Sequence, residues 1–444
     1  MTDDQWRNKL RATTEKYAGD AFDAESWDTF ARSIHYFTGD VDKPETFGEL
    51  DAHLKSQERN GTSDRLYYLS TSPLLYAMIV KRLGRSGMSD QTQGARRVII
   101  EKPFGTDLES ARQLNHEVHT AFDETQVYRI DHYLGKETVN NVLVLRFGNT
   151  IFEPIWNRNY IDSIQITANE EVLVGHRAPF YEKAGILRDM FQNHLMQLLT
   201  FVTMEPPSRF EADDLRDEKV KVLRAIRAMT PDEVTVNTLR GQYRSYRDEP
   251  GVDKSSRVAT YLAMRLMIDN WRWKDVPIYL RSGKGLSCRT TQIVIQFRRP
   301  PHIMFEHEND SDHTMSFLQT NRLLIQIQPA EGIQIYFQTK VPDTDMQMRQ
   351  TELKFNFRDS FQSELPEAYE RLLLDALNGD ASLFARNDEV EAAWQIIDPI
   401  QQTWDIDVAT SPEPYDVNTW GPPSATDWIR RFGHEWFDLC PVIR

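Results

Sequence analysis

Residues 97–102 are Arg97-Val98-Ile99-Ile100-Glu101-Lys102, and Pro103-Phe104-Gly105 follows them. The apolar centre of this stretch is continuous and does not alternate with polar residues, which is typical of a strand buried on both faces. Because proline and glycine favour turns, the strand is expected to end at residue 103. Strands of this kind occur almost only in parallel sheets that are covered by helices. The stretch therefore indicates an α/β fold around it.

The segments on either side repeat this pattern. Residues 65–70 form a short apolar and aromatic stretch, and residues 126–131 form another. Pro73 opens a helical run over residues 74–83, and a second run with a period of 3.6 residues follows the strand at 97–102. Strand, helix, strand, helix and strand in this order predict a parallel sheet.

The rest of the chain has a different pattern. Residues 3–60 predict two or three polar helices, and residues 160–168 predict a strand. Helices are expected at 186–204, 217–228, 258–269 and within 365–397. Alternating apolar and polar residues predict antiparallel strands at 277–280, 292–298, 322–328, 332–339 and 352–357. The sequence thus predicts an α/β domain over residues 1–130 and a larger α+β domain over residues 131–444.

The composition excludes several classes of protein. The 444 residues carry a net charge of −15, from 52 basic and 67 acidic residues, and such a surface repels nucleic acid and anionic lipid. No apolar run approaches the roughly 20 residues of a membrane-spanning helix. Cys288 and Cys440 are the only cysteines, which rules out a disulfide framework and suits a reducing compartment. We therefore expect a cytoplasmic protein that binds neither nucleic acid nor membranes.

A parallel sheet at the start of a chain suggests dinucleotide binding, which needs a glycine-rich turn between the first strand and the first helix. The sequence has no such turn. Gly84-Arg85-Ser86-Gly87 follows a predicted helix and precedes a strand, so it is interpreted as the end of that helix and a loop. The residues by themselves therefore do not predict a nucleotide cofactor.

The densest polar cluster follows the third strand. Asp131, His132, Tyr133 and Lys136 lie within one short turn, at the strand end where open α/β sheets bind ligands. The imidazole, the phenol and the ammonium group are able to hold a phosphate together. The alternative is an ordinary polar turn between a strand and a helix. Lys102, at the end of the preceding strand, is similarly either a ligand-binding residue or a surface lysine.

The predicted helix 186–204 carries a histidine within its apolar stripe. His194 is therefore either a hydrogen-bonded core residue or a general base whose pKa is tuned by a carboxylate. Asp189 lies about 140° from His194 around an ideal α-helix, so helix geometry alone does not bring these two side chains into one pocket.

We predict no metal site. His116 and His119 lack the four-residue spacing of a zinc-binding helix. His302, His307 and His313 lie among acidic residues and are interpreted as part of a solvated loop.

Several segments together resemble the glucose-6-phosphate dehydrogenase family over essentially the whole chain. The two most specific are Arg129-Ile130-Asp131-His132-Tyr133-Leu134-Gly135-Lys136-Glu137 and Arg188-Asp189-Met190-Phe191-Gln192-Asn193-His194. The others are Glu101-Lys102-Pro103-Phe104-Gly105, Leu280-Arg281-Ser282-Gly283-Lys284, Tyr369-Glu370-Arg371-Leu372-Leu373-Leu374-Asp375 and Thr419-Trp420-Gly421-Pro422.

The resemblance implies a reaction and a set of roles. His194 would be the base that removes the proton from the C1 hydroxyl of glucose 6-phosphate, and Asp131 would pair with His194. The substrate would be bound by Lys102, His132, Tyr133, Lys136, Glu170, Asp189, Lys284 and Arg289. The cofactor would be NADP, contacted by Lys102, Tyr68 and Pro103, and the product would be 6-phosphogluconolactone, in the first step of the oxidative pentose phosphate pathway. The family also implies a homodimer or a homotetramer.

The resemblance has one large departure. Family members open with a strand and a Gly-x-x-Gly-Asp-Leu loop, whereas Met1 coincides with a later helix, so we expect an N-terminally truncated Rossmann-like domain. One alternative is a non-catalytic paralogue that binds a sugar phosphate or a partner subunit. Another is a different sugar dehydrogenase, because several of these enzymes share the Glu-Lys-Pro tripeptide.

Overall fold

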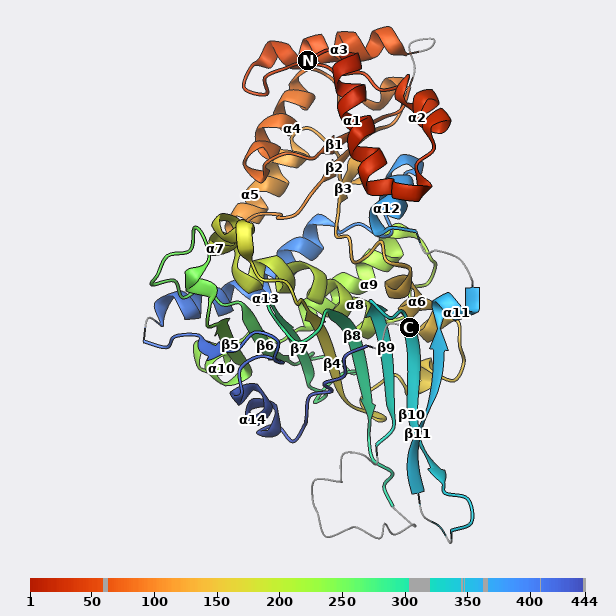
Figure 1. Ribbon diagram of the computed structural model, residues 1–444, viewed down its shortest axis with the longest axis vertical. Helices are drawn as coiled ribbons and strands as arrows, with labels where there is room; N and C mark the ends of the chain where they lie inside the picture. Colours follow the sequence, from red (N-terminus) through yellow and green to blue (C-terminus); the bar gives the residue numbers. More distant parts are fainter. Residues whose placement is uncertain are drawn as a thin grey trace.

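The computed structural model describes residues 1–58, 63–302, 320–344, 346, 348–361, 366–407 and 409–441. These residues form two sheets (Figure 1). A three-stranded sheet has the order β1-β2-β3, and a nine-stranded sheet has the order β11-β10-β9-β8-β4-β7-β6-β5-β12. The predicted combination of a small parallel-sheet domain and a larger domain of strands and helices is thus confirmed.

The small sheet contains β1 (Arg65–Leu69), β2 (Arg96–Ile100) and β3 (Val127–Arg129), all parallel. Val98, Ile99 and Ile100 are buried, as the continuous apolar stretch predicted. The sheet connections contain two helices, α4 (Tyr76–Arg85) and α5 (Leu108–His119). The predicted polar helices at the N-terminus are confirmed as α1 (Asp3–Ala18), α2 (Ala24–Ala31) and α3 (Pro44–Gln57). Their expected end at Asn60-Gly61 lies outside the described residues.

The large sheet is mainly antiparallel. Its strands are β4 (Ile161–Asn169), β5 (Thr238–Tyr243), β6 (Tyr261–Leu266), β7 (Ile278–Gly283), β8 (Thr290–Phe297), β9 (Arg322–Gln328), β10 (Gly332–Lys340), β11 (Met348–Asn356) and β12 (Glu413–Tyr415). Among the described residues of this sheet, only two pairs of adjacent strands, β4 with β7 and β5 with β12, are parallel. The helix predicted at 258–269 is wrong: this segment forms β6, because a short apolar run suits a buried strand as well as a helix.

Helices cover the sheet and join the two parts of the molecule (Figure 1). They are α6 (Glu137–Phe147), α7 (Ala178–Ile186), α8 (Met196–Thr203), α9 (Ala212–Ala225), α10 (Pro231–Asn237), α11 (Phe357–Phe361), α12 (Ala368–Asn378), α13 (Asn387–Ile406) and α14 (Ser424–Arg430). Helix α13 contacts both α5 of the small domain and α9 of the large one. Among the described residues, no helix combines the length and the apolar character needed to cross a membrane.

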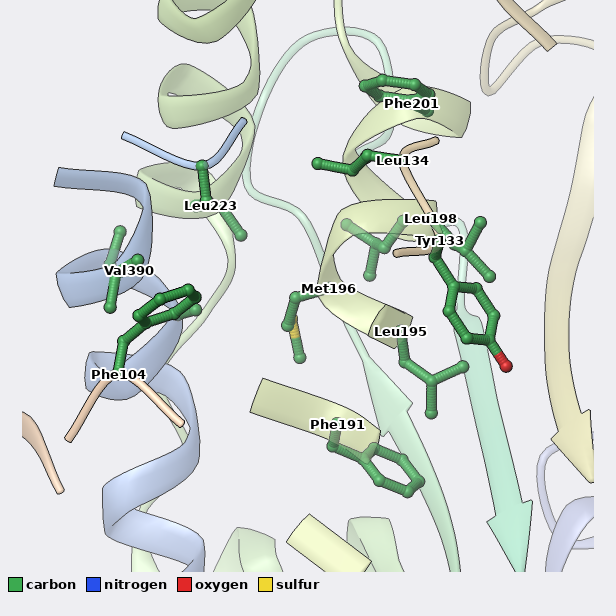
Figure 2. Packing of buried hydrophobic residues seen from close by; sticks show 14 of the residues in the cluster. Phe104, Tyr133, Leu134, Phe191, Leu195, Met196, Leu198, Phe201, Leu223 and Val390 are labelled. Atoms are coloured by element: carbon green, nitrogen blue, oxygen red, sulfur yellow. The ribbon is translucent and has the colours of Figure 1, made fainter. Parts of the chain in front are cut away.

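The largest core surrounds the segment that leads into α8. Every residue of α8 is buried. In Figure 2, side chains of α8 and of the turn before it converge with Leu223 of α9 and Val390 of α13. Phe104, directly after the tripeptide at the end of β2, belongs to the same core. The elements that carry the predicted site residues are therefore anchored in one continuous core.

A disulfide joins the C-terminal tail to the large sheet, and the sequence analysis did not anticipate it. Cys288, just before β8, pairs with Cys440, and their Cα atoms are 5.9 Å apart. Two cysteines 152 positions apart in the sequence give no sign of pairing. The composition correctly excluded a framework of several disulfides but not this single bond.

Candidate active site

A buried histidine and a buried aspartate form the centre of the candidate site. Asp131, directly beyond β3, places Oδ1 2.5 Å from Nδ1 of His194, and both side chains are almost completely buried. Burial alone would raise the pKa of Asp131, but the adjacent His194 holds this pKa well below its usual range. Burial lowers the pKa of His194, and Asp131 partly opposes this shift. His194 is therefore neutral near pH 7, and its partner is ionised.

His194 and Asp189 lie on a π-helical segment, η7 (Leu187–Leu195). The sequence analysis assumed α-helical geometry, which by itself does not bring the two side chains into one pocket, whereas this segment is π-helical. In a π-helix the hydrogen bonds run from i to i+5, so residues five apart come nearly into line. Asp189 and His194 are five apart, and one ammonium group, that of Lys102, contacts both. Isolated π-helical turns are frequent at functional sites for this reason.

Lys102 fixes the tautomer of His194. Its Nζ lies 2.7 Å from His194 Nε2 and 3.1 Å from the backbone oxygen of Asp189. An ammonium group only donates hydrogen bonds, so Nε2 must accept, and the ring proton resides on Nδ1, where it is donated to Asp131. Nε2 thus carries the lone pair of a base, which accepts the hydrogen bond from Lys102 in this structure. Lys102 follows β2, so the carboxyl ends of β2 and β3 supply two of these three residues.

A second charged cluster adjoins the first. Lys284 Nζ lies 2.8 Å from Asp189 Oδ2 and also forms an ion pair with Glu170. Burial would raise the pKa of Asp189, but Lys284 and then Lys102 lower it to about 2. The parallel pairing of β4 and β7 explains the position of the pair: Asn169 is opposite Gly283, so the next residue of each strand is Glu170 or Lys284. Asp189 is therefore an ionised acceptor, and both carboxylates lie beside the Lys284 ammonium group.

The remaining residues of the polar turn lie on the other side of His194. The Tyr133 ring stacks on the His194 ring with 4.3 Å between centroids, and the His132 ring is 4.6 Å from the same ring. Burial, followed by the charge of His194, lowers the pKa of His132 to about 3. Lys136 Nζ donates to Gln328 Oε1 at 2.8 Å. Burial is the main cause of a lowered pKa of Lys136. The positive charge of Arg289, which is exposed, lowers this pKa further.

The residues predicted to contact a cofactor lie at the carboxyl ends of β1 and β2. Tyr68 donates from its hydroxyl to Glu101 Oε1 at 2.6 Å, and Tyr369 donates to Oε2 of the same carboxylate at 3.3 Å. Glu101 directly precedes Lys102, and Pro103 follows it through a cis peptide bond. Tyr68 and Pro103 therefore sit at the sheet edge next to Lys102.

The geometry gives no independent support for a metal. Asp131, His132 and His194 have potential ligand atoms within 4.8 Å of one another. However, the ammonium group of Lys102 faces His194 Nε2, and a cation there disfavours a second one. His307 and His313 of the histidine-containing loop lie outside the described residues.

Four residues near these groups were missed by the sequence analysis: Arg177, Thr291, Gln328 and Tyr369. Arg177 lies 3.7 Å from Asp189 Oδ1. Thr291, on β8, hydrogen-bonds to Tyr133, and Gln328, on β9, accepts from Lys136. Gln328 also donates to Thr291. Tyr369 lies in a segment quoted for the family resemblance, which was the one available signal. The two strand residues gave none, because sheet pairing brings them to the site.

Two family models match the chain in succession. The model described as "Glucose-6-phosphate dehydrogenase, NAD binding domain" matches residues 1–141, and "Glucose-6-phosphate dehydrogenase, C-terminal domain" matches residues 143–437. With the parallel sheet and the His–Asp pair, these matches define a dehydrogenase that uses a nicotinamide cofactor. The chain belongs to the glucose-6-phosphate dehydrogenase family.

Individual relatives agree with this assignment. The glucose-6-phosphate 1-dehydrogenase of Chlamydia pneumoniae is 40% identical over 98% of this chain and 87% of its own length. The glucose-6-phosphate 1-dehydrogenase 2 of Mycobacterium bovis is 43% identical over 94% of this chain and 82% of its own length. The expectation of a missing nucleotide-binding start is not confirmed, because the NAD-binding-domain model matches from residue 1.

Solved structures show the same similarity. The glucose-6-phosphate 1-dehydrogenase of Mycobacterium avium has a TM-score of 0.84 and 36% identity, covering 99% of this chain and 90% of that one. A glucose-6-phosphate dehydrogenase in complex with its substrate glucose 6-phosphate has a TM-score of 0.88 and 33% identity, with the same coverage.

Proposed function

We propose that this protein oxidises glucose 6-phosphate at C1 to 6-phosphogluconolactone, with NADP as the hydride acceptor, as the first step of the oxidative pentose phosphate pathway. The observation that carries the proposal is the buried His194, whose Nδ1 donates to Asp131 and whose Nε2 accepts from Lys102. A neutral imidazole that presents Nε2 as an acceptor and has an ionised partner at Nδ1 suits removal of a hydroxyl proton.

The chain contributes proton transfer and positioning. His194 Nε2 takes the proton of the C1 hydroxyl, and Asp131 stabilises the imidazolium that forms. Lys102 leaves Nε2 to the substrate and donates instead to the sugar and the cofactor. Glu170 and Asp189 accept hydrogen bonds from sugar hydroxyls, and Lys284 holds both carboxylates in place while it contacts the substrate.

The residues at the sheet edge fit a nicotinamide cofactor. Open parallel sheets bind such ligands at the carboxyl ends of their strands, which is where Tyr68, Lys102 and Pro103 lie. When bound, the nicotinamide ring supplies the hydride acceptor. The residues of this chain that we assign to the cofactor are these three.

The phosphate of the substrate is assigned to the other side of the site. His132, Tyr133, Lys136 and Arg289 surround this region, and two of the four are cationic at pH 7. Charge-assisted hydrogen bonds to phosphate are about twice as strong as neutral ones. In the proposal, residues 1–130 bind the nucleotide, and residues 131–444 together with Lys102 bind the sugar phosphate. We also propose a homodimer or a homotetramer located in the cytoplasm.

The test is the absorbance of reduced nicotinamide with glucose 6-phosphate and each of NADP and NAD. We expect turnover when glucose 6-phosphate and a nicotinamide cofactor are both present, and a higher kcat/KM with NADP than with NAD. Turnover only with NAD would contradict the choice of cofactor, and turnover only with an unphosphorylated sugar would contradict the choice of substrate. The relatives described above all carry the name of the enzyme, so the comparisons give the non-catalytic alternative no support.

Replacing Lys136 with Gln should raise the KM for glucose 6-phosphate. Loss of one charge-assisted hydrogen bond costs about 1.5 kcal/mol at the lower end, or roughly tenfold in KM. The kcat should change little, because the Lys136 ammonium group donates to Gln328 and takes no part in the proposed proton transfer. Steady-state kinetics checks this, and Lys221→Gln, at an exposed lysine that pairs with Glu218, is the matched control. An equal rise in KM in both variants would contradict the assignment of Lys136 to the phosphate site.

A further inference from the structure

A second cavity, separate from the candidate active site, lies beside the start of the segment that carries Asp189 and His194. Its volume is about 330 Å³, and its walls come from the end of α7, the start of η7, strand β5, the residues before β6 and helix α13. Cavities of this size fall at the lower end of small-molecule sites. None of the residues assigned above to substrate or cofactor lines it.

The cavity has more cations than available anions. Four basic residues line it: Lys183, Arg188, Arg240 and Arg257. The two acidic residues in its wall are already engaged by neighbours. Glu182 accepts hydrogen bonds from the hydroxyls of Tyr246 and Ser256, and Asp405 accepts one from Gln401. On a chain with a net charge of −15, such a concentration of positive charge needs a specific explanation.

Two of the four cations compete for the same acceptor. The guanidinium groups of Arg240 and Arg257 both donate to the backbone oxygen of Thr410. The nearest carboxylate oxygen to Arg240 belongs to Asp407 and is 3.9 Å away, although the Arg240 side chain is only 10% exposed. Burial, and then the charge of Arg257, lower the pKa of Arg240. Two like charges are thus held close together in a partly dry site.

Arg257 also has an unused donor. Its Nε is buried and finds no hydrogen-bond acceptor among the described residues. A buried donor without a partner costs stability, so an acceptor is expected to fill this position. Guanidinium groups match the oxygens of phosphate in planar, two-point hydrogen bonds. The arrangement therefore has the charge and the donor geometry of an anion site.

We propose that this cavity binds a small metabolite with more negative charge than a single phosphate group, such as a pyrophosphate or a bisphosphate, and that its binding changes the affinity of the enzyme for its substrate. The wall of the cavity includes Gly185, Ile186 and Leu187, where α7 joins η7. Gly185 has a φ of 60°, a conformation that favours glycine, so this joint is a defined feature of the fold. Asp189 follows two residues after Leu187, which connects the cavity to the active site.

The test is isothermal titration calorimetry with pyrophosphate as the probe, in the presence of saturating glucose 6-phosphate. The sugar phosphate occupies the catalytic phosphate site, so the remaining heat reports the second cavity. We expect one binding site, weakened at least tenfold in Arg257→Gln. Lys183→Gln is a second variant, because its exposed side chain is not required for folding, and it should weaken binding several-fold. Arg244→Gln, an exposed arginine outside the cavity, is the matched control and should bind as the unmodified chain does.

Three results would overturn the proposal: no binding beside saturating glucose 6-phosphate, equal affinity in all variants, or an equal loss in the Arg244→Gln control. The effect on substrate affinity rests on the proposed function, whereas binding does not. If the protein shows no turnover, the same titrations of the unmodified chain, Arg257→Gln and Arg244→Gln still report binding in the cavity, so the two questions remain separate. Pyrophosphate binding that is weakened at least tenfold in Arg257→Gln would support the cavity as an anion site even if the protein did not catalyse the proposed reaction.

Discussion

Replacing His194 with Asn should lower kcat by roughly 10²–10⁴, the usual contribution of a general base. The variant retains a polar side chain but has no basic nitrogen to accept the C1 hydroxyl proton. Substrate affinity should change much less, because the proposed phosphate contacts come from Lys136 and its neighbours. Steady-state kinetics and calorimetric titration with glucose 6-phosphate measure the two effects separately.

A matched variant distinguishes chemistry from folding. His116 is an exposed histidine on α5, so His116→Asn makes the same chemical change away from the site and should leave kcat unaltered. Thermal unfolding of both variants shows whether loss of the buried His–Asp contact reduces stability. A His194→Asn protein that keeps more than a tenth of the activity would rule out His194 as the base.

The pH profile of the unmodified enzyme follows from the same group. Only neutral His194 accepts a proton, so kcat/KM should fall as pH drops through its pKa. Burial places this pKa below the ordinary value of about 6.5, and activity should therefore persist below pH 6.5 before the acid limb begins.

Replacing Asp131 with Asn should lower kcat by roughly 10- to 150-fold. The variant removes the negative charge that stabilises the imidazolium, and hydrogen bonds to charged groups contribute about 1.5–3 kcal/mol. The acid limb of kcat/KM should move to lower pH, because Asp131 raises the pKa of His194 and an amide does not. Initial rates between pH 4.5 and 8 measure both effects.

Asp123→Asn is the control for this substitution, since Asp123 is exposed and lies before β3. It should show neither the lower rate nor the shifted limb. An acid limb that moves to higher pH in Asp131→Asn would contradict the proposed pairing, because it would mean that Asp131 lowers the pKa of His194.

The sequence predicted the small sheet well, because each of its strands is a continuous apolar stretch closed by turn residues. It also placed Asp131 and Lys102 at neighbouring strand ends, since parallel strands present their carboxyl ends at one edge. These inferences needed only local patterns. The failure at β6 is of another kind: six residues of a buried strand lack the length or alternation that would distinguish them from helix.

The local geometry of η7 was not predictable from pattern. Nothing in the sequence Leu187–Leu195 separates a π-helix from an α-helix, because the choice depends on which contacts the turn makes in the folded core. That choice decides whether Asp189 and His194 share a site. Thr291 and Gln328 were missed for a related reason: they lie far along the chain and reach Tyr133 and Lys136 only through the pairing of β8 and β9.

The parallel pairing of β4 and β7 has a consequence for how the length of this chain can vary. The two strands end together, with Asn169 opposite Gly283, and present Glu170 and Lys284 side by side. Adding or removing one residue within either strand would displace its end by about 3.3 Å and turn its side chains to the opposite face of the sheet. Insertions and deletions are therefore expected only in the segments that connect the strands. The lengths of β4 and β7 are constrained as strongly as the identities of Glu170 and Lys284 at their ends.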